Sequence, residues 1–180
     1  MKIVIFDTET TGLLLPKAAP IEKQPKIIEL GVIVVTDGVL TGEHNWLINP
    51  GEEISAEITK ITGIKNEQLH GLPSFKDQLH MFKDVFKDSD IGVCHNAPFD
   101  TGMMKNDLAR AGCEDFPWPA EMMCTVQEYM HVFGKRAKLT QLYEHFMGKP
   151  LAQTHRALDD AHAVYEVLLK DGFFDKMSGA

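Results

Sequence analysis

KIVIFD, at residues 2–7, carries apolar side chains at both odd and even positions and ends in an acid. A strand that is apolar on both faces is buried on both sides, so this segment predicts the central strand of a sheet. Residues 26–36 (KIIELGVIVVT) predict a second strand, and Asp37-Gly38 predicts a hairpin into a third strand near 43–48.

The rest of the chain alternates between helical and extended patterns, after a proline-rich loop expected at 13–25. Helices are expected as two short segments within 55–70, then from Ser74 to about Lys87, and at about 97–111 (capped by Asn96), 125–133, 139–147 and 155–170; strands are expected at 90–95 and near 121–124. Residues 172–180 are expected to be a loose tail. This order predicts an α/β fold in a single domain, residues 1–180, with a mixed five-stranded sheet flanked by helices.

Composition places the chain among globular proteins. Its 180 residues are 44% hydrophobic and 24% charged, which excludes a disordered chain and is enough to bury a core. No apolar run reaches the roughly 18 residues of a membrane span, and acids follow the apolar start where a signal peptide would have its cleavage site. Cys94, Cys113 and Cys124 form no CxxC pair, which argues against disulfides and structural zinc. We therefore expect a cytoplasmic, intracellular protein in a reducing compartment, without membrane contact.

The formal net charge of −8 is unfavourable for a protein that binds nucleic acid. Two bound divalent ions would halve this charge, so acidity argues against tight nonspecific binding and less against an enzyme that holds one chain end. The compact basic cluster of Lys135, Arg136 and Lys138 predicts either contacts to phosphates or an ordinary solvated loop.

Asp7 and Glu9 lie at the end of the predicted central strand, and residues two apart in a strand point to the same face. Two like charges held close together in a buried position are costly unless a cation lies between them. An isolated D-x-E pair is more often a strand end followed by a solvated acid, so the pair alone does not predict a site.

The last long helix supplies a third acid. On a 3.6-residue period its inward stripe is formed by Ala157, Asp160, Ala161, Val164 and Leu168. Asp160 is therefore expected to face the core, whereas Asp159 is expected to face solvent. A core-facing acid usually pairs with a base or binds a metal ion.

The helix at 97–111 begins its own inward stripe with Asp100, although the helix dipole alone also favours an acid in a first turn. Together, Asp7, Glu9, Asp100 and Asp160 are four carboxylates from three elements that can reach one edge of the sheet. Oxygen ligands of this kind suit Mg²⁺ or Mn²⁺ and do not suit zinc.

Three motifs resemble, in order and spacing, those of the DEDDh exonucleases, a subgroup of the DEDD superfamily that includes the proofreading subunit of the bacterial replicative DNA polymerase. The motifs are FDTETTG at 6–12, CHNAPFD at 94–100 and HRALDD at 155–160, and ITKITGI at 58–64 resembles a family segment between the first two. The resemblance covers roughly residues 3–170 and implies a ribonuclease-H-like fold with 3′–5′ exonuclease activity.

Carried over position by position, the resemblance implies that Asp7, Glu9, Asp100 and Asp160 hold two Mg²⁺ or Mn²⁺ ions, with His155 as the general base. On a regular helix His155 would lie about 140° from Asp160, so we expect it in the loop or first turn before the helix. The implied reaction is attack of water on a phosphodiester bond, with release of nucleoside 5′-monophosphates.

The resemblance also implies contacts to the terminal nucleotide from the turn after the first strand, at Thr10, Thr11, Gly12 and Leu13. Glu57 and Thr62 are candidates for contact with the terminal sugar. Phe99 is a candidate for contact with the next base, and a buried core phenylalanine is an equally good interpretation.

The expected function is a 3′–5′ exonuclease acting on DNA, with single-stranded or frayed ends favoured, in proofreading or repair. The alternative is an RNA-trimming or oligoribonucleotide-degrading exoribonuclease, because the motifs do not report the sugar. A non-catalytic nucleic-acid-binding relative is less favoured, since all five motif residues are present. The expected partner is the 3′ end of a nucleic acid; a polymerase partner stays open and is not indicated by the sequence.

Overall fold

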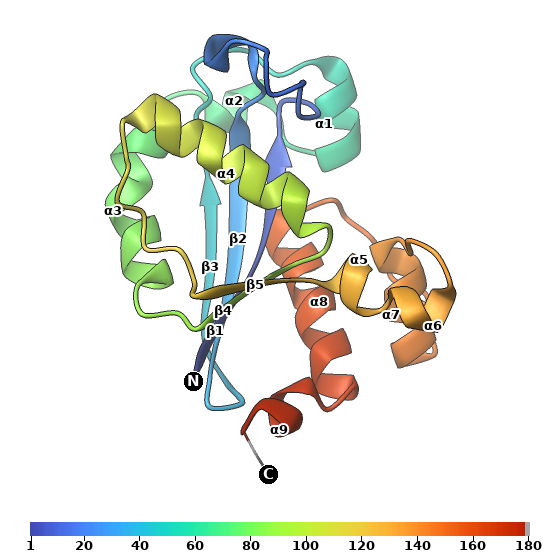
Figure 1. Ribbon diagram of the computed structural model, residues 1–180. Coiled ribbons are helices and arrows are strands. Elements are labelled where there is room, and N and C mark those ends of the chain that lie inside the picture. The colour runs from blue at the N-terminus through green and yellow to red at the C-terminus, as the bar shows by residue number, and fades with distance from the viewer. Residues whose placement is uncertain (179–180) are drawn as a thin grey trace.

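The computed structural model describes residues 1–178, and its centre is a five-stranded sheet with the order β3-β2-β1-β4-β5 (Figure 1). The strands are β1 (Lys2–Thr10), β2 (Ile27–Thr36), β3 (Val39–Leu47), β4 (Ile91–Cys94) and β5 (Glu121–Cys124). The pairs β1–β2 and β2–β3 are antiparallel, whereas β1–β4 and β4–β5 are parallel. The predicted mixed sheet with a central first strand is confirmed.

Two strands are longer than the sequence predicts. β1 continues beyond Asp7 because Glu9 pairs with Glu29, and after a bulge Thr10 pairs with Ile27. β3 starts directly after the predicted Asp37-Gly38 turn, not near residue 43. Both turn residues have positive φ angles, 50° and 81°, the conformation that a tight two-residue hairpin requires.

The helices follow the predicted order, with a short 3₁₀ turn, η1 (Ile21–Lys23), inside the expected loop. They are α1 (Ala56–Thr62), α2 (Asn66–Leu69), α3 (Phe75–Phe86), α4 (Ala97–Ala111), α5 (Thr125–Glu128), α6 (Met130–Phe133), α7 (Leu139–Met147), α8 (Ala157–Lys170) and α9 (Phe173–Ser178). The single helix expected at 125–133 is wrong, because the chain breaks at Tyr129 into α5 and α6.

The loose tail expected at 172–180 is also wrong for most of its length. Residues 173–178 form α9, where Phe174 is buried and its ring lies 5.7 Å from that of Tyr165 on α8. Phe173 and Phe174 both pack against the core cluster that includes α8, so this segment is held on the domain. Residues 179 and 180 of the expected tail lie outside the described part of the chain.

The two N-caps that the sequence predicts have different outcomes. Ser74 caps α3 as expected, since its hydroxyl accepts a hydrogen bond from the Asp77 N–H at 3.3 Å. Asn96 has a left-handed backbone (φ 69°) and makes no side-chain cap, so this prediction is wrong. Its Oδ1 instead accepts a hydrogen bond from Arg136 Nη2 at 2.8 Å, which ties the start of α4 to the loop before α7.

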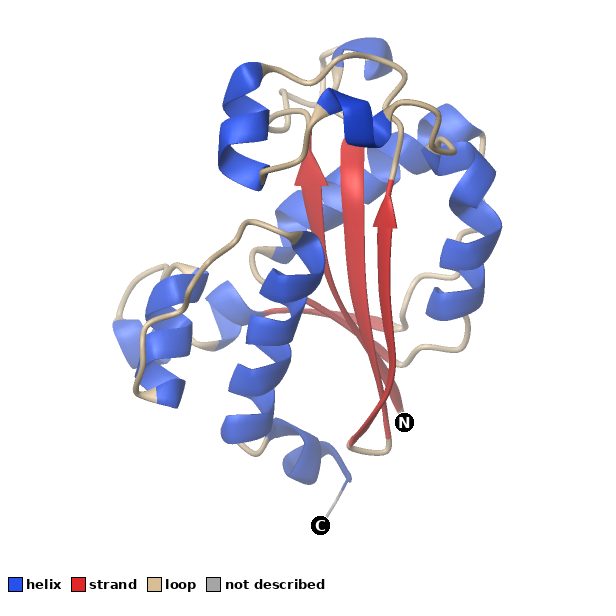
Figure 2. Cartoon of the chain, turned by 180° about the vertical axis from the view of Figure 1, so that it is seen from behind, coloured by secondary structure: helices blue, strands red, loops and turns tan. Residues whose placement is uncertain are grey.

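Helices cover both faces of the sheet, as Figures 1 and 2 show from opposite sides. Along β1, Val4 and Phe6 pack in the cluster that includes α3 and α4, whereas Ile3 and Ile5 pack in the cluster that includes α7 and α8. α8 lies directly on β1 and β2. Among residues 1–178, none of the helices has the length and apolar character that a bilayer crossing requires.

Candidate active site

Asp7 and Glu9 project from the same face of β1, opposite Gly31 and Glu29 of β2. Gly31 is required there because α8 crosses β2 at very close range. A Cβ atom on residue 31 would lie 2.3 Å from the backbone nitrogen of Leu158, so any other side chain would displace the helix. The first turn of α8 can therefore reach the two acids of β1.

Asp100 and Asp160 come from the first turns of α4 and α8, and both are buried. Asp100 Oδ1 accepts hydrogen bonds from the N–H of Thr8 at 3.0 Å and from its hydroxyl at 2.8 Å, which fixes α4 to β1 between the two other acids. Asp160 Oδ2 accepts a longer bond, 3.3 Å, from Gln153. The predicted helical phases are confirmed: Asp160 faces the interior and its neighbour Asp159 is exposed.

His155 lies in the loop immediately before α8, as the angular argument predicts. Its backbone is left-handed, with φ at 50°, an uncommon conformation for a residue other than glycine. One ligand atom from each of Glu9, His155 and Asp160 lies within 4.8 Å of the others. The imidazole therefore leans over the carboxylates instead of following the helix.

The electrostatics of the cluster fit a bound cation. Burial is the main cause that raises the pKa of Asp7 well above its ordinary value, and the charges of Asp100, Asp160 and Glu9 raise it further. Burial and the neighbouring acids raise the pKa of Glu9 to about 8. Burial also raises the pKa values of Asp100 and Asp160. Hydrogen bonds from Thr8 lower the pKa of Asp100, and one from Gln153 lowers that of Asp160, but burial is the larger effect. Four acids that repel one another in this way, and that offer carboxylate oxygens as ligand atoms, form a suitable site for a hard divalent ion.

A cavity of about 600 Å³ opens on the Glu9 side of the cluster. Its lining includes every residue that the sequence predicts for substrate binding, namely Thr10, Thr11, Gly12, Leu13, Glu57, Thr62 and Phe99. Leu13 is 79% exposed, so this apolar side chain is free to contact a ligand. Thr62 is buried, and its hydroxyl donates to the Ile58 carbonyl at 2.9 Å and accepts from the Ile64 N–H at 3.1 Å.

A second cavity, of about 660 Å³, lies on the other side and is lined by Asp7, His155 and Asp160. Its lining also includes Arg136 and Lys138, two members of the predicted basic cluster, but not the third, Lys135; all three are exposed. His95 also lines this cavity, and burial lowers its pKa to about 4, so its imidazole is neutral at physiological pH. The carboxylates thus separate a largely apolar cavity from one with a basic wall.

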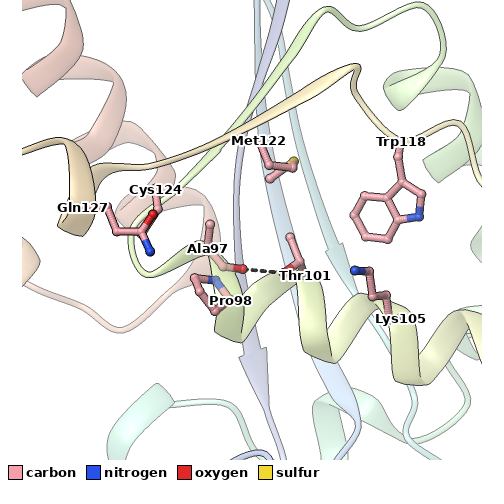
Figure 3. Close-up of a pocket in the computed structure, with 8 residues that line it drawn as sticks. All are labelled: Ala97, Pro98, Thr101, Lys105, Trp118, Met122, Cys124 and Gln127. Carbon is pink, nitrogen blue, oxygen red and sulfur yellow. Dashed lines mark hydrogen bonds between the residues drawn. The ribbon is translucent and has the colours of Figure 1, made fainter.

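A third cavity, of about 530 Å³, lies between α4 and β5 (Figure 3). Its lining includes Trp118, Met122 and Lys105, whose ammonium nitrogen lies 5.8 Å from the centre of the Trp118 ring. None of the residues that line it, among those the structure describes, carries a carboxylate side chain. This cavity is therefore unsuited to the metal chemistry that the acid cluster supports.

Glu29 is the residue of this region that the sequence analysis missed. It is completely buried on β2, and its carboxylate is paired with Arg156. The available signal was a single acid inside the apolar strand KIIELGVIVVT. A charge in such a strand requires a buried partner, and here the partner lies within the third motif.

The first prediction concerns the metal-free protein. An acid whose pKa is raised on folding stabilises the fold below its unfolded pKa, and this contribution is lost as the pH rises through the folded value. For Glu9 that window extends from 4.5 to about 8. We therefore expect the Tm measured in excess chelator to fall between pH 5.5 and pH 8, and added Mg²⁺ or Mn²⁺ to restore it.

In the same assay Asp7→Asn should raise the metal-free Tm at pH 8, by about 2–4 °C for each kcal/mol of repulsion removed. Glu144→Gln is the control, because Glu144 is an exposed acid on α7. A metal-free Tm that increases over this pH range would contradict the repulsion argument.

Comparisons with known proteins agree on one family. Residues 4–168 match the family model RNase_T, described as "Exonuclease". The chain is 32% identical over 165 residues to a PolC-type DNA polymerase III of Clostridium perfringens, covering 92% of this chain and 11% of that protein. It is 32% identical over 173 residues to the DNA polymerase III subunit epsilon of Rickettsia prowazekii, covering 93% of this chain and 72% of that one.

Among solved structures, the nuclease domain of 3′hExo, a DEDDh family member bound to rAMP, superposes with a TM-score of 0.76. The two chains are 19% identical, and the match covers 95% of this chain and 92% of that one. At this identity the likeness establishes the fold alone, and it agrees with the ribonuclease-H-like architecture expected from the motifs.

Proposed function

Since this chain belongs to the exonuclease family, we propose that it hydrolyses phosphodiester bonds at the 3′ end of a nucleic acid and releases nucleoside 5′-monophosphates. The observation that carries the proposal is the cluster of Asp7, Glu9, Asp100 and Asp160, whose charges act on one another, with His155 close to Glu9 and Asp160 and a cavity beside Asp7 and another beside Glu9. A chain end bound in one cavity would place its last phosphodiester beside these five residues.

Asp7, Glu9, Asp100 and Asp160 are the residues that would hold two Mg²⁺ or Mn²⁺ ions. When bound, such ions orient the scissile phosphate and stabilise negative charge on the attacking and leaving oxygens. His155 accepts a proton from the attacking water while the oxygen of that water forms a bond to phosphorus. The bond from phosphorus to the 3′-oxygen of the preceding nucleotide breaks, and that oxygen takes up a proton to become the new 3′-hydroxyl.

The cavity on the Glu9 side is the proposed place of the terminal nucleotide. Leu13 offers an exposed apolar side chain against the base, and the exposed carboxylate of Glu57 can accept a hydrogen bond from the sugar. The hydroxyl of Thr62 is already engaged by backbone groups, so Thr62 would contribute to the wall of the cavity and not a hydrogen bond to the sugar. Arg136 and Lys138, which line the second cavity, would attract the phosphates of the preceding nucleotides.

DNA is the favoured substrate, with single-stranded or frayed ends, because the relatives at 32% identity are named as DNA polymerase III proteins. RNA is the alternative, since the contacts around Glu57 would also accept a 2′-hydroxyl. The chain spans only 11% of the Clostridium protein, so an association with a polymerase is likewise a proposal. An intracellular location is proposed on the basis of the three free cysteines.

One assay tests these proposals together. End-labelled single-stranded DNA, duplex DNA with a mismatched 3′ end, and RNA of the same sequence are digested in parallel with Mg²⁺, with Mn²⁺ and with excess chelator. We expect single-nucleotide shortening from the 3′ end, fastest on single-stranded DNA, and no shortening in chelator. Shortening from the 5′ end, or undiminished activity in chelator, would refute the proposed reaction.

A further inference from the structure

Glu29 and Arg156 form an ion pair beside the acid cluster that the proposed reaction itself does not use; the carboxylate is fully buried, and the arginine is about one-third exposed. Arg156 Nε donates to both carboxylate oxygens of Glu29 at 3.0 Å, and its Nη2 also donates to Oε1. Asn45 Nδ2 donates to Oε1 at 2.9 Å, and the N–H of Ala157 donates to Oε2 at 3.0 Å. Both oxygens of this fully buried acid are therefore occupied by protein donors.

This arrangement separates Glu29 from the acids of the site, although it lies opposite Glu9 in the register of β1 and β2. Isolated burial of a carboxylate is costly, and paired burial requires good geometry with every lone pair satisfied. Here the oxygens of the Glu29 carboxylate accept hydrogen bonds from one arginine, one side-chain amide and one backbone N–H. A carboxylate engaged in this way is a structural anchor and not a metal ligand.

The anchor acts at the point where the chain enters α8. Three consecutive residues have three different backbone conformations: His155 is left-handed, Arg156 is extended (φ −117°, ψ 131°) and Ala157 is helical. The side chain of Arg156, the N-cap residue, makes no cap hydrogen bond to α8. Glu29 replaces the missing cap from a different strand, because it accepts the first-turn N–H of Ala157.

A left-handed backbone is unfavourable for a histidine relative to an ordinary conformation, so its surroundings must hold it there. On its C-terminal side that constraint is the Glu29–Arg156 pair. We propose that this pair is a positioning device that holds His155 in its left-handed conformation, and so keeps the imidazole beside Glu9 and Asp160. The inference rests on the proposed role of His155 as the base.

Kinetics on a labelled single-stranded oligonucleotide with saturating Mg²⁺ test the proposal. Removing a group that orients a reacting residue costs about 10–100-fold in activity. Arg156→Gln should therefore lower kcat by this factor and change KM by less than about threefold. Arg156→Lys, which keeps the charge and loses the forked contact, should fall between this variant and the wild type.

Tyr143→Phe is the matched control. It removes the hydrogen bond from Tyr143 on α7 to Glu166 on α8, which lies far from the first turn of α8. It should lower Tm and leave kcat unchanged. In the background of His155→Ala, Arg156→Gln should lower kcat no further, because the residue through which it acts is absent.

The positioning role is overturned if Arg156→Gln lowers Tm as Tyr143→Phe does and leaves kcat within twofold of the wild type. It is also overturned if the kcat losses of His155→Ala and Arg156→Gln multiply in the double variant. If Arg156→Gln does not fold, Arg156→Lys gives the same comparison. A wild-type protein without 3′ nucleotide release would refute the proposed function instead, so the two failures are distinguishable.

Discussion

Asp160→Asn is expected to lower the rate of nucleotide release by about 10³-fold or more, whereas Asp159→Asn should stay within a few-fold of the wild type. Divalent-ion catalysis contributes several kcal/mol to such reactions, and 1.36 kcal/mol corresponds to a factor of ten in rate. Asp160 is buried in the acid cluster, and Asp159 is exposed on the next position of α8. The two variants remove the same charge from adjacent residues and differ only in the face of the helix.

Single-turnover rates at several Mg²⁺ concentrations, together with Tm values, provide the measurement. Asp159 accepts a hydrogen bond from the Thr154 hydroxyl at 2.6 Å, and asparagine keeps an oxygen at that position, so the loop before α8 should stay in place. Equal losses in the two variants would mean that the helical phase of α8 does not determine which acid serves the reaction.

His155→Ala is expected to lower the rate by about 10²–10⁴-fold, the usual contribution of a positioned general base. Binding of the divalent ion should change little, because four carboxylates remain. His162→Ala is the control, since His162 lies on α8, the helix that follows His155, and its Nε2 contacts a carboxylate oxygen of Glu43 at the surface, 3.3 Å away. Rates are compared at saturating Mg²⁺, and ion affinity is followed through the metal-dependent increase in Tm.

If His155→Ala and His162→Ala keep similar, near-normal rates, His155 has no part in proton transfer. If His155→Ala loses activity only because its ion affinity falls, the histidine serves as a ligand. A rate loss that persists at saturating ion with an unchanged metal-dependent increase in Tm supports the base.

The parts of the fold that the sequence predicts well are those with a strong local period. KIVIFD predicts a strand that is buried on both faces, and the stripes of α4 and α8 identify Asp100 and Asp160 as inward-facing. These patterns work because a helix and a strand each repeat at a fixed interval, so one misplaced acid is conspicuous. The roles of the four acids and of His155 remain predictions, although the structure brings all five side chains together.

The features that the sequence does not predict depend on contacts between distant segments. Asn96 has the side chain of an ordinary cap, but Arg136 engages it from another loop. Glu29 is visible as an acid in an apolar strand, but its partner lies far along the chain. α9 is short, and Phe174 is buried because α8 and the turn at Gly38, which are distant in the sequence, lie beside it. No local pattern encodes such pairings.

The division of the core between the two faces of the sheet has a consequence for biosynthesis. α3 and α4 precede α7, α8 and α9 in the chain, so one face of the sheet is covered by segments that leave the ribosome late. Asp7, Glu9 and Asp100 emerge before that second layer, and Asp160 arrives with it. A nascent polypeptide therefore carries three of the four acids before the fourth can join them, and the proposed hydrolysis would have to wait until α8 has folded onto the sheet.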